Sequence, residues 1–371
     1  MPVASEAPRI YSCDDHLDIY NIPPDLWTSR LSAKHREEGP RVVRQNDIDV
    51  WVAGDAVLGR SGVFPGSATQ REGVPDDGYR ASDPKLRMED MERDGIHASI
   101  VYGPGALWGF PVSDPDLKRE VLRAWNDWAA EVFNAYMPDR LSALAALPTR
   151  NAKEAVAELH RALELGHKGV LFRIHDVEDF NALPDEWEPL WAAAAETGVP
   201  FSFHIGGGGR IDLDVIEDTR IRPWKIPAFS AAVPLQLDEV LAVLVFAGIL
   251  ERHPGLKVVL AESGIGWLPY FVNRMDQQFE KHCPRHKGMM TTPPSELFRR
   301  QVWATFEEEP LGPQLIPLLG PDNFMWACDY PHPDSTWPNS HAAIEESMGA
   351  LGSEVIHKVT SENCQKLYRL P

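Results

Sequence analysis

The sequence predicts a (β/α)₈ TIM barrel, eight parallel strands enclosed by helices, with long insertions after strands 1 and 5. Two observations lead to this prediction. Short apolar runs alternate with longer helical stretches along the chain, and several of the runs end in His, Asp or Glu. Because the strand tips of such a barrel meet at one face, these polar ends are expected to lie together there.

The eight predicted strands are apolar runs rich in Val, Ile, Leu and Phe, at 10–14, 98–103, 142–148, 169–173, 200–204, 257–262, 301–306 and 323–329. Helices are predicted between them, at 83–93, 114–136, 152–165, 185–197, 235–252, 265–281 and 341–351. Asp83-Pro84 and Asp114-Pro115 place a capping residue before a proline in the first helical turn, and Gly166 and Gly198 follow helix ends. These local signals support the alternation.

Two segments, 19–81 and 205–234, fall outside the repeat. The first is rich in Pro and Gly but also carries Trp27, Trp51 and Phe64, so we expect an irregular insertion rather than a disordered loop. Both segments follow strand ends, so both are expected to cover the barrel mouth as lids. A barrel of about 250 residues with insertions accounts for the length, and residues 1–371 are therefore predicted to form a single domain.

Composition excludes several classes of protein. The chain has 55 acidic and 36 basic residues and a net charge of -19, which would repel nucleic acid and an anionic membrane surface. No run approaches the ~18 apolar residues of a membrane span, and the first residues lack the features of a signal peptide, so a cytoplasmic location is expected. The four cysteines show no CxxC spacing, which argues against a disulfide framework or a thiolate zinc site.

Candidate metal ligands stand at the ends of three predicted strands. In an extended strand Asp14 and His16 share a face, so both can reach the barrel axis while Asp15 points elsewhere. His204 and Asp329 each end an apolar run, where an unpaired polar group would be costly to bury. Carboxylate oxygens and imidazole nitrogens are both suitable ligands for a catalytic divalent cation.

Four phrases of the chain are more specific than these spacings: Asp-Asp-His-Leu-Asp at 14–18, Phe-His-Ile-Gly-Gly at 203–207, Ala-Glu-Ser-Gly-Ile-Gly-Trp-Leu-Pro-Tyr at 261–270 and Trp-Ala-Cys-Asp-Tyr-Pro-His-Pro-Asp-Ser at 326–335. In these phrases the chain resembles the second amidohydrolase-related family, which includes aminocarboxymuconate semialdehyde decarboxylase-like and dihydroxybenzoate decarboxylase-like enzymes. The resemblance extends over nearly the whole chain and implies a metal-dependent (β/α)₈ barrel.

The resemblance also implies a ligand set. Asp14 and His16 stand where the family has its H-x-H or E-x-H metal pair, His204 stands for its strand-five ligand, and Asp329 for its strand-eight aspartate. The implied cofactor is one divalent metal ion, Zn²⁺ in the first place. Because Asp14 adds negative charge to the site, Mn²⁺ and Mg²⁺ are the alternatives.

Three residues are predicted to be catalytic: Glu262, Asp329 and His332. Glu262 stands where the family's decarboxylases often carry a His, as proton donor or base, and a carboxyl group can do this work if burial raises its pKa. His332 is included for its place in the Asp-Tyr-Pro-His phrase. The three acidic residues at 307–309 are expected to form a solvated loop.

Two residues are predicted to bind substrate. Arg173 ends the fourth strand, where its guanidinium can clamp a carboxylate; an ion pair with an acidic residue is the equal alternative. Trp337 is a candidate for lining an aromatic slot, although tryptophan is also an ordinary core residue.

The predicted function is a non-oxidative decarboxylase of a small aromatic or unsaturated carboxylic acid. The alternative uses the same residues to activate water for hydrolysis of an amide, ester, lactone or C–C bond. A barrel that only binds a ligand is a minor alternative. The expected partners are the small-molecule carboxylate and a second copy of the chain in a homodimer, the commonest assembly.

Overall fold

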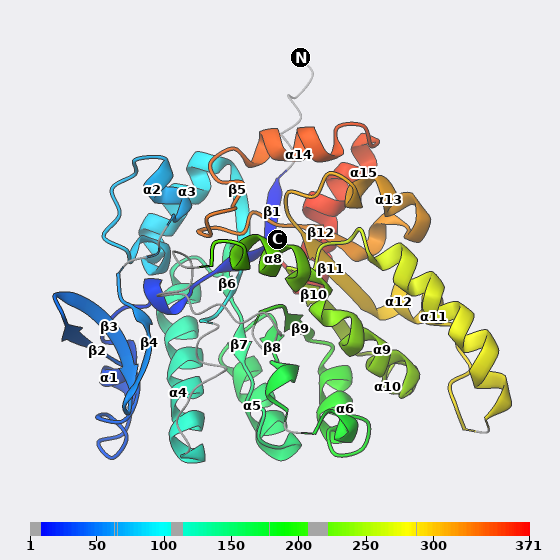
Figure 1. The fold of residues 1–371 in the computed structure, drawn as a ribbon, viewed down its shortest axis with the longest axis horizontal. Helices are drawn as coiled ribbons and strands as arrows, with labels where there is room; N and C mark the ends of the chain where they lie inside the picture. Colours follow the sequence, from blue (N-terminus) through cyan, green and yellow to red (C-terminus); the bar gives the residue numbers. More distant parts are fainter. Residues whose placement is uncertain are drawn as a thin grey trace.

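The computed structural model describes residues 9–62, 64, 66–104, 114–177, 179–206, 222–286 and 288–371. Its centre is a ring of parallel strands (Figure 1). The ring consists of β1 (Ile10–His16), β5 (Ile96–Tyr102), β6 (Leu141–Ala143), β7 (Ala145–Ala146), β8 (Val170–Leu171), β9 (Pro200–His204), β10 (Lys257–Ala261), β11 (Val302–Phe306) and β12 (Phe324–Trp326). Each of the eight predicted strands overlaps one of these strands or, for 142–148, the pair β6 and β7.

Hydrogen bonds join the strands into a closed ring. The strand order is β1-β5-β6 in one sheet and β7 through β12 in the other. The strands β6 and β7 are one strand interrupted at Leu144, whose N–H donates to the carbonyl of Val101 at 2.9 Å. Just past β12, the N–H of Asp329 donates to the carbonyl of Asp14 at 2.9 Å. The predicted TIM barrel is confirmed.

Helices cover the outside of the barrel (Figure 1). Their start and stop signals act as the sequence indicates: the Asp83 carboxylate accepts hydrogen bonds from the N–H groups of Lys85 and Leu86, and Gly198 adopts a φ of 60° after its helix. The helices are α1 (Leu26–Arg30), α2 (Ala68–Arg71), α3 (Pro84–Asp94), α4 (Pro115–Trp128), α5 (Ala152–Glu164), α6 (Glu188–Thr197), α8 (Lys225–Ala232), α9 (Asp238–Phe246), α10 (Ile249–Arg252), α11 (Leu268–His282), α12 (Pro294–Gln301), α13 (Gly312–Leu319), α14 (Ser340–Met348), α15 (Ser353–His357) and α16 (Asn363–Tyr368).

The segment 19–81 is more regular than expected. It contains an antiparallel sheet of β2 (Arg41–Gln45), β3 (Ile48–Ala53) and β4 (Ala56–Arg60), which lies outside the ring (Figure 1). The positive φ angles of Asn46 and Asp47 form the tight turn between β2 and β3. Trp51 is buried edge-on against Trp27, with ring centroids 5.0 Å apart. The expectation of an irregular segment is therefore wrong, because part of this insertion forms a regular sheet whose Trp51 packs into the same hydrophobic core as the barrel.

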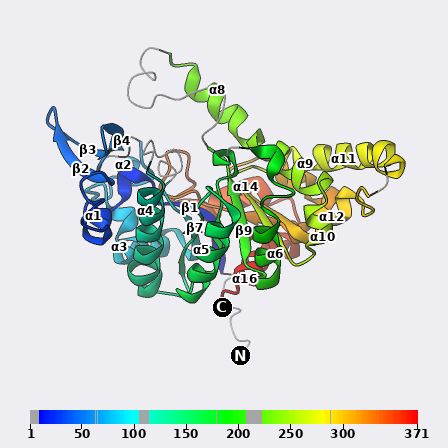
Figure 2. The same ribbon diagram turned by 90° about the horizontal axis from the view of Figure 1, so that it is seen from below.

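Part of the predicted second insertion, 207–221, lies outside the described residues. After it, α8 projects from the body of the molecule (Figure 2), and none of its residues is buried. The stretch Lys225–Phe246 is the one helical stretch in the described part of the chain that is long and apolar enough to cross a membrane. Within this stretch, Val240, Leu241, Leu244 and Val245 of α9 are buried in the hydrophobic core of the molecule.

Candidate metal centre and active site

The predicted metal ligands lie together at the carboxyl ends of the barrel strands. Asp14 and His16 come from β1, His204 from the end of β9, and Asp329 from the loop after β12. The side chains of β1 alternate as predicted. Asp15 points away from Asp14 and His16 and pairs with Arg87 of α3 at 2.9 Å. The structure therefore brings together residues from three distant parts of the fold.

The geometry of these ligands fits a divalent cation. Asp14 Oδ1, His16 Nε2, His204 Nε2 and Asp329 Oδ1 are all buried, and none of them makes a well-formed hydrogen bond with a described residue, although Asp329 Oδ1 lies 2.8 Å from His332 Nδ1. His16 Nε2 lies 3.4 Å from Asp14 Oδ1 and 3.1 Å from Asp329 Oδ1, and His204 Nε2 lies 3.4 Å from the same Asp14 oxygen. Ligands about 2.0–2.2 Å from one cation are roughly 3–3.5 Å apart. Asp14, His16 and His204 form one group of possible ligand atoms, and His16, Glu262, Asp329 and His332 form a second group that shares His16. Because buried polar atoms normally have hydrogen-bond partners, these clustered atoms indicate a ligand set.

Neighbouring groups fix which atom each ligand presents. His204 Nδ1 donates to the carbonyl of Ile205 at 2.7 Å, which leaves the lone pair of Nε2 free for a metal. Burial alone would raise the pKa of Asp14, but the interactions with His204 and His16 outweigh burial and hold the pKa well below its ordinary value. Asp14 is therefore ionised, as a metal ligand must be.

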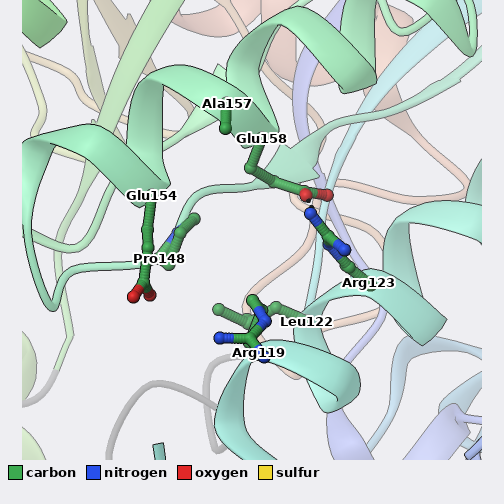
Figure 3. Close-up of a pocket in the computed structure, with 7 residues that line it drawn as sticks. All are labelled: Arg119, Leu122, Arg123, Pro148, Glu154, Ala157 and Glu158. Atoms are coloured by element: carbon green, nitrogen blue, oxygen red, sulfur yellow. Dashed lines mark hydrogen bonds and ion pairs between the residues drawn. The ribbon is translucent and has the colours of Figure 1, made fainter. Parts of the chain in front are cut away.

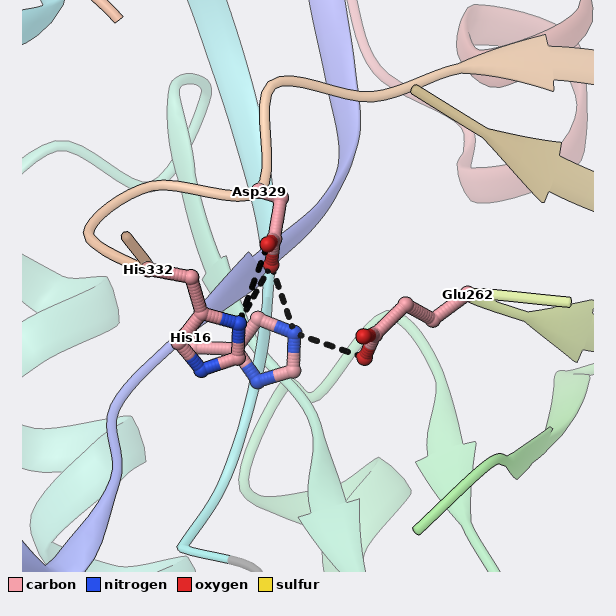
Figure 4. Close-up of side chains that lie close together, drawn as sticks. All are labelled: His16, Glu262, Asp329 and His332. Carbon is pink, nitrogen blue, oxygen red and sulfur yellow. Dashed lines mark hydrogen bonds and ion pairs between the residues drawn. The ribbon is translucent and has the colours of Figure 1, made fainter. Parts of the chain in front are cut away.

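Glu262 borders the ligand set (Figure 4). Its Oε2 lies 3.2 Å from His204 Nε2 and 3.5 Å from His16 Nε2, and a quarter of its side chain is exposed. Its backbone has a φ of 52°, a conformation that is uncommon for a residue other than glycine. Glu262 is thus positioned both to contact the metal centre and to exchange protons with solvent.

His332 supports the ligands His16 and Asp329. Its ring stacks on His16 with centroids 4.0 Å apart, and its Nδ1 lies 3.0 Å from Asp329 Oδ2 (Figure 4). Its Nε2 lies 2.8 Å from Asp18 Oδ2. Burial would lower the pKa of His332, but Asp329 and Asp18 raise it well above its ordinary value. Burial would likewise raise the pKa of Asp18, yet His332 lowers it to about 2. Asp18 was not predicted, although it stands two residues after His16.

Arg173 follows β8, and its Nε lies 3.2 Å from Asp176 Oδ1. Burial lowers the pKa of Arg173 and raises that of Asp176 to about 6. The ion pair that was one of the two expectations for Arg173 is therefore present. Its role in substrate binding stays a prediction.

Trp337 is not part of the cluster. Only 3% of the residue is exposed, its indole N–H donates to the carbonyl of Asp90 at 2.9 Å, and its ring packs against Tyr330. Asp90 belongs to α3 and Tyr330 to the loop after β12, so Trp337 packs between these two elements. These contacts fit the ordinary core role that was the alternative for Trp337, and its role in substrate binding stays a prediction.

The predicted solvated loop at 307–309 is wrong for two of its residues. Glu307 is half-buried, and burial together with the charges of Asp329, Glu262 and Asp14 raises its pKa well above its ordinary value. Glu309 accepts hydrogen bonds from backbone N–H groups of the loop after β10. A run of acidic residues alone gives no signal that separates these roles from that of a solvated loop.

A cavity of about 60 Å³ lies elsewhere, between α4 and α5 (Figure 3). Within it Arg123 pairs with Glu158 at 2.9 Å, and it contains none of the predicted site residues. Its charges are compensated within the protein, so it is not part of the metal centre.

Comparisons with known proteins agree with this geometry. The family model described as amidohydrolase matches residues 48–370. The gamma-resorcylate decarboxylase of Rhizobium radiobacter is 27% identical over 303 residues, covering 76% of this chain and 86% of that protein. An amidohydrolase structure from Mycobacterium avium subsp. paratuberculosis K-10 superposes with a TM-score of 0.77 at 22% identity, covering 97% of both chains.

One further structure has a bearing on the metal. A dihydroxybenzoic acid decarboxylase from Polaromonas sp. JS666, solved with bound manganese and the inhibitor 2-nitroresorcinol, has a TM-score of 0.62 at 19% identity and covers 98% of both chains. At such identities the structures show the shared barrel fold. The family model, however, spans most of the sequence, and the chain belongs to the amidohydrolase family.

Proposed function

We propose that this protein is a metal-dependent decarboxylase of a small aromatic carboxylic acid. The observation that carries the proposal is the cluster of buried ligand atoms from Asp14, His16, His204 and Asp329, with the Glu262 carboxylate 3.2 Å from His204 Nε2. Decarboxylase relatives in the same family support the reaction type, since the chain is 27% identical to one of them over most of its length.

Asp14, His16, His204 and Asp329 would hold the metal. Two carboxylate oxygens and two imidazole nitrogens suit Mn²⁺ as well as Zn²⁺. We propose Mn²⁺ because the similar Polaromonas structure contains manganese; Zn²⁺, favoured from the sequence, is the competing outcome of the metal analysis. When bound, the cation supplies positive charge that orients the substrate carboxylate and stabilises negative charge on a neighbouring oxygen.

The chain's own residues position the substrate and move the proton. Arg173, oriented by Asp176, provides a second anchor for the substrate carboxylate. Glu262, in its protonated form, delivers its proton to the ring carbon that bears the carboxylate. A C–H bond forms at that carbon, the bond to the carboxylate breaks, its electron pair returns to the ring, and CO₂ leaves. We assign the proton to Glu262 rather than to Asp329 because Asp329 accepts a hydrogen bond from His332.

The test is turnover of dihydroxybenzoates and related aromatic acids by the Mn²⁺-loaded and Zn²⁺-loaded protein in isotopically labelled water. In D₂O we expect CO₂ release and one deuterium in the product, at the carbon that lost its carboxylate. In H₂¹⁸O we expect no label in the aromatic product. Incorporation of ¹⁸O into the product without CO₂ release would instead show the hydrolytic alternative.

We also propose that the protein is a cytoplasmic homodimer. The exposed apolar surface around α8 supports self-association, since Trp224 is 57% and Ile226 is 45% exposed. Light scattering should give twice the chain mass of 41.5 kDa. A monomer at micromolar concentration would contradict this assembly.

A further inference from the structure

Thr305 connects a metal ligand with the proposed proton donor. It lies in β11 and is fully buried. Its hydroxyl oxygen is 2.7 Å from Asp14 Oδ2 and 2.7 Å from the backbone nitrogen of Glu262. One side chain thus joins β1, where Asp14 lies, to the loop after β10, where Glu262 lies.

The direction of both hydrogen bonds follows from the groups involved. The N–H of Glu262 can only donate, so the Thr305 oxygen accepts from it. The carboxylate of Asp14 can only accept, so the single hydroxyl hydrogen of Thr305 is donated to Asp14 Oδ2. Asp14 Oδ2 is therefore occupied, whereas Oδ1 is the buried atom without a hydrogen bond to any described residue.

A second contact holds the same loop. The Glu309 carboxylate accepts from the N–H groups of Ile265 at 2.7 Å and Gly266 at 2.8 Å. A Cβ atom at Gly266 would lie 2.5 Å from Glu309 Oε1, and one at Gly312 would lie 2.5 Å from the Glu309 side chain. A larger residue at either position would displace the Glu309 carboxylate from this arrangement. The loop that starts at Glu262 is thus fixed by Thr305 at its first residue and by Glu309 three residues later.

We propose that Thr305 is a positioning residue that restricts Asp14 to a single metal-binding oxygen and fixes Glu262 relative to that oxygen. If both oxygens of Asp14 were to bind the metal, the hydrogen bond from Thr305 would have to break. A ligand held to one oxygen leaves more of the metal's coordination positions for substrate. The inference deepens the proposed function and rests on it.

The test compares Thr305→Val with Thr305→Ser. Valine keeps the shape of threonine but removes the hydroxyl, whereas serine retains the hydroxyl. The readout is Mn²⁺ affinity, measured from the free-ion signal in electron paramagnetic resonance titrations and by chelator competition. We expect Thr305→Val to weaken binding by about 10–100-fold, the usual effect of removing a group that orients a ligand, and Thr305→Ser to restore affinity to near that of the wild type. The spectrum of bound Mn²⁺ should also change in the valine variant alone.

Thr360→Val is the matched control. Thr360 is also buried, and its hydroxyl donates to the carbonyl of Ile356 at 2.9 Å, away from the metal ligands. This variant loses a buried hydroxyl of the same kind, so its Mn²⁺ affinity should be unchanged. Circular dichroism of the metal-free proteins establishes that each variant is folded, and Thr305→Ala replaces the valine variant if the latter does not fold.

The inference is overturned if Thr305→Val, or Thr305→Ala in its place, binds Mn²⁺ as tightly as the wild type with an unchanged spectrum. It is also overturned if Thr305→Ser loses as much affinity as Thr305→Val, because the hydroxyl would then not be the cause. Failure of the proposed function gives different results: a wild-type protein that binds neither Mn²⁺ nor Zn²⁺ has no metal centre, and one that binds the metal but releases no CO₂ is not a decarboxylase.

Discussion

The backbone N–H of Asp329 donates a hydrogen bond of 2.9 Å to the carbonyl oxygen of Asp14, and this bond joins the last strand of the barrel to the first. A second bond, from the N–H of His16 to the carbonyl of Tyr330 at 2.8 Å, follows directly. Three of the four proposed metal ligands are therefore held by the same contacts that close the barrel. Metal binding and the integrity of the fold are coupled at this seam.

The first prediction concerns the metal and His204. Wild-type protein should contain about one divalent ion per chain, and added Mn²⁺ should raise its melting temperature because ligands that bind the folded state stabilise it. In His204→Ala both effects should disappear, as measured by elemental mass spectrometry and thermal unfolding. His286→Ala, at an exposed histidine, is the control and should behave like the wild type. Unchanged metal content in His204→Ala would remove His204 from the ligand set.

The second prediction concerns Glu262. Glu262→Gln keeps the size of the side chain but cannot donate an acidic proton, so kcat for decarboxylation should fall about 10²–10⁴-fold. Metal content should stay at the wild-type level. Glu308→Gln changes an exposed glutamate nearby and should leave kcat unchanged. A parallel loss of metal in Glu262→Gln would show that Glu262 is a ligand rather than a proton donor.

The third prediction concerns the ion pair behind β1. Arg87 is fully buried, contacts Asp15 at 2.9 Å and donates to the carbonyl of His16 at 3.2 Å. Arg87→Met leaves the buried Asp15 charge without its partner and should lower the free energy of unfolding by about 3–5 kcal/mol in urea titrations. Arg44→Met, which breaks the exposed pair with Asp49, should cost about 0–1 kcal/mol. Similar losses in both variants would contradict this account.

The fourth prediction concerns Asp94 and pH. Burial is the main cause that raises the pKa of Asp94 from 3.8 to about 6, against hydrogen bonds from Ser340 that lower it. Between these two pH values the folded protein binds a proton that the unfolded chain does not. This carboxyl group therefore lowers the free energy of unfolding as pH rises from about 4 to 6, by about 2–3 kcal/mol in all.

Asp94→Asn removes this dependence on pH. The difference in free energy of unfolding, variant minus wild type, should increase by about 2–3 kcal/mol between about pH 4 and pH 6 and then level off. Denaturant titrations at several pH values measure the difference. Asp55→Asn, at an exposed carboxylate in the turn between β3 and β4, should show no such trend. A difference that does not change with pH would contradict the burial argument for Asp94.

The sequence by itself determined the barrel and the residues proposed to hold the metal. Strand formation depends on local apolar runs, and β9 has the predicted bounds, Pro200–His204. The ligand positions follow from two local rules: alternate residues of a strand share a face, and parallel strands end at the same side of a barrel. These rules place Asp14, His16, His204 and Asp329 without knowledge of any contact between them.

Only the tertiary structure decided which other residues face this centre. Thr305 and Asp14 are 291 positions apart, and nothing in the run Val302–Phe306 indicates that its threonine would donate to an aspartate of β1. From the sequence, Glu307 and Glu309 were predicted to be solvated and Trp337 to contact the substrate. The sequence alone does not show the burial of a loop side chain, because that burial is set by the elements packed against it. Local pattern fixes which face of a strand a residue occupies, whereas the partner across a closed barrel depends on how all eight strands come together.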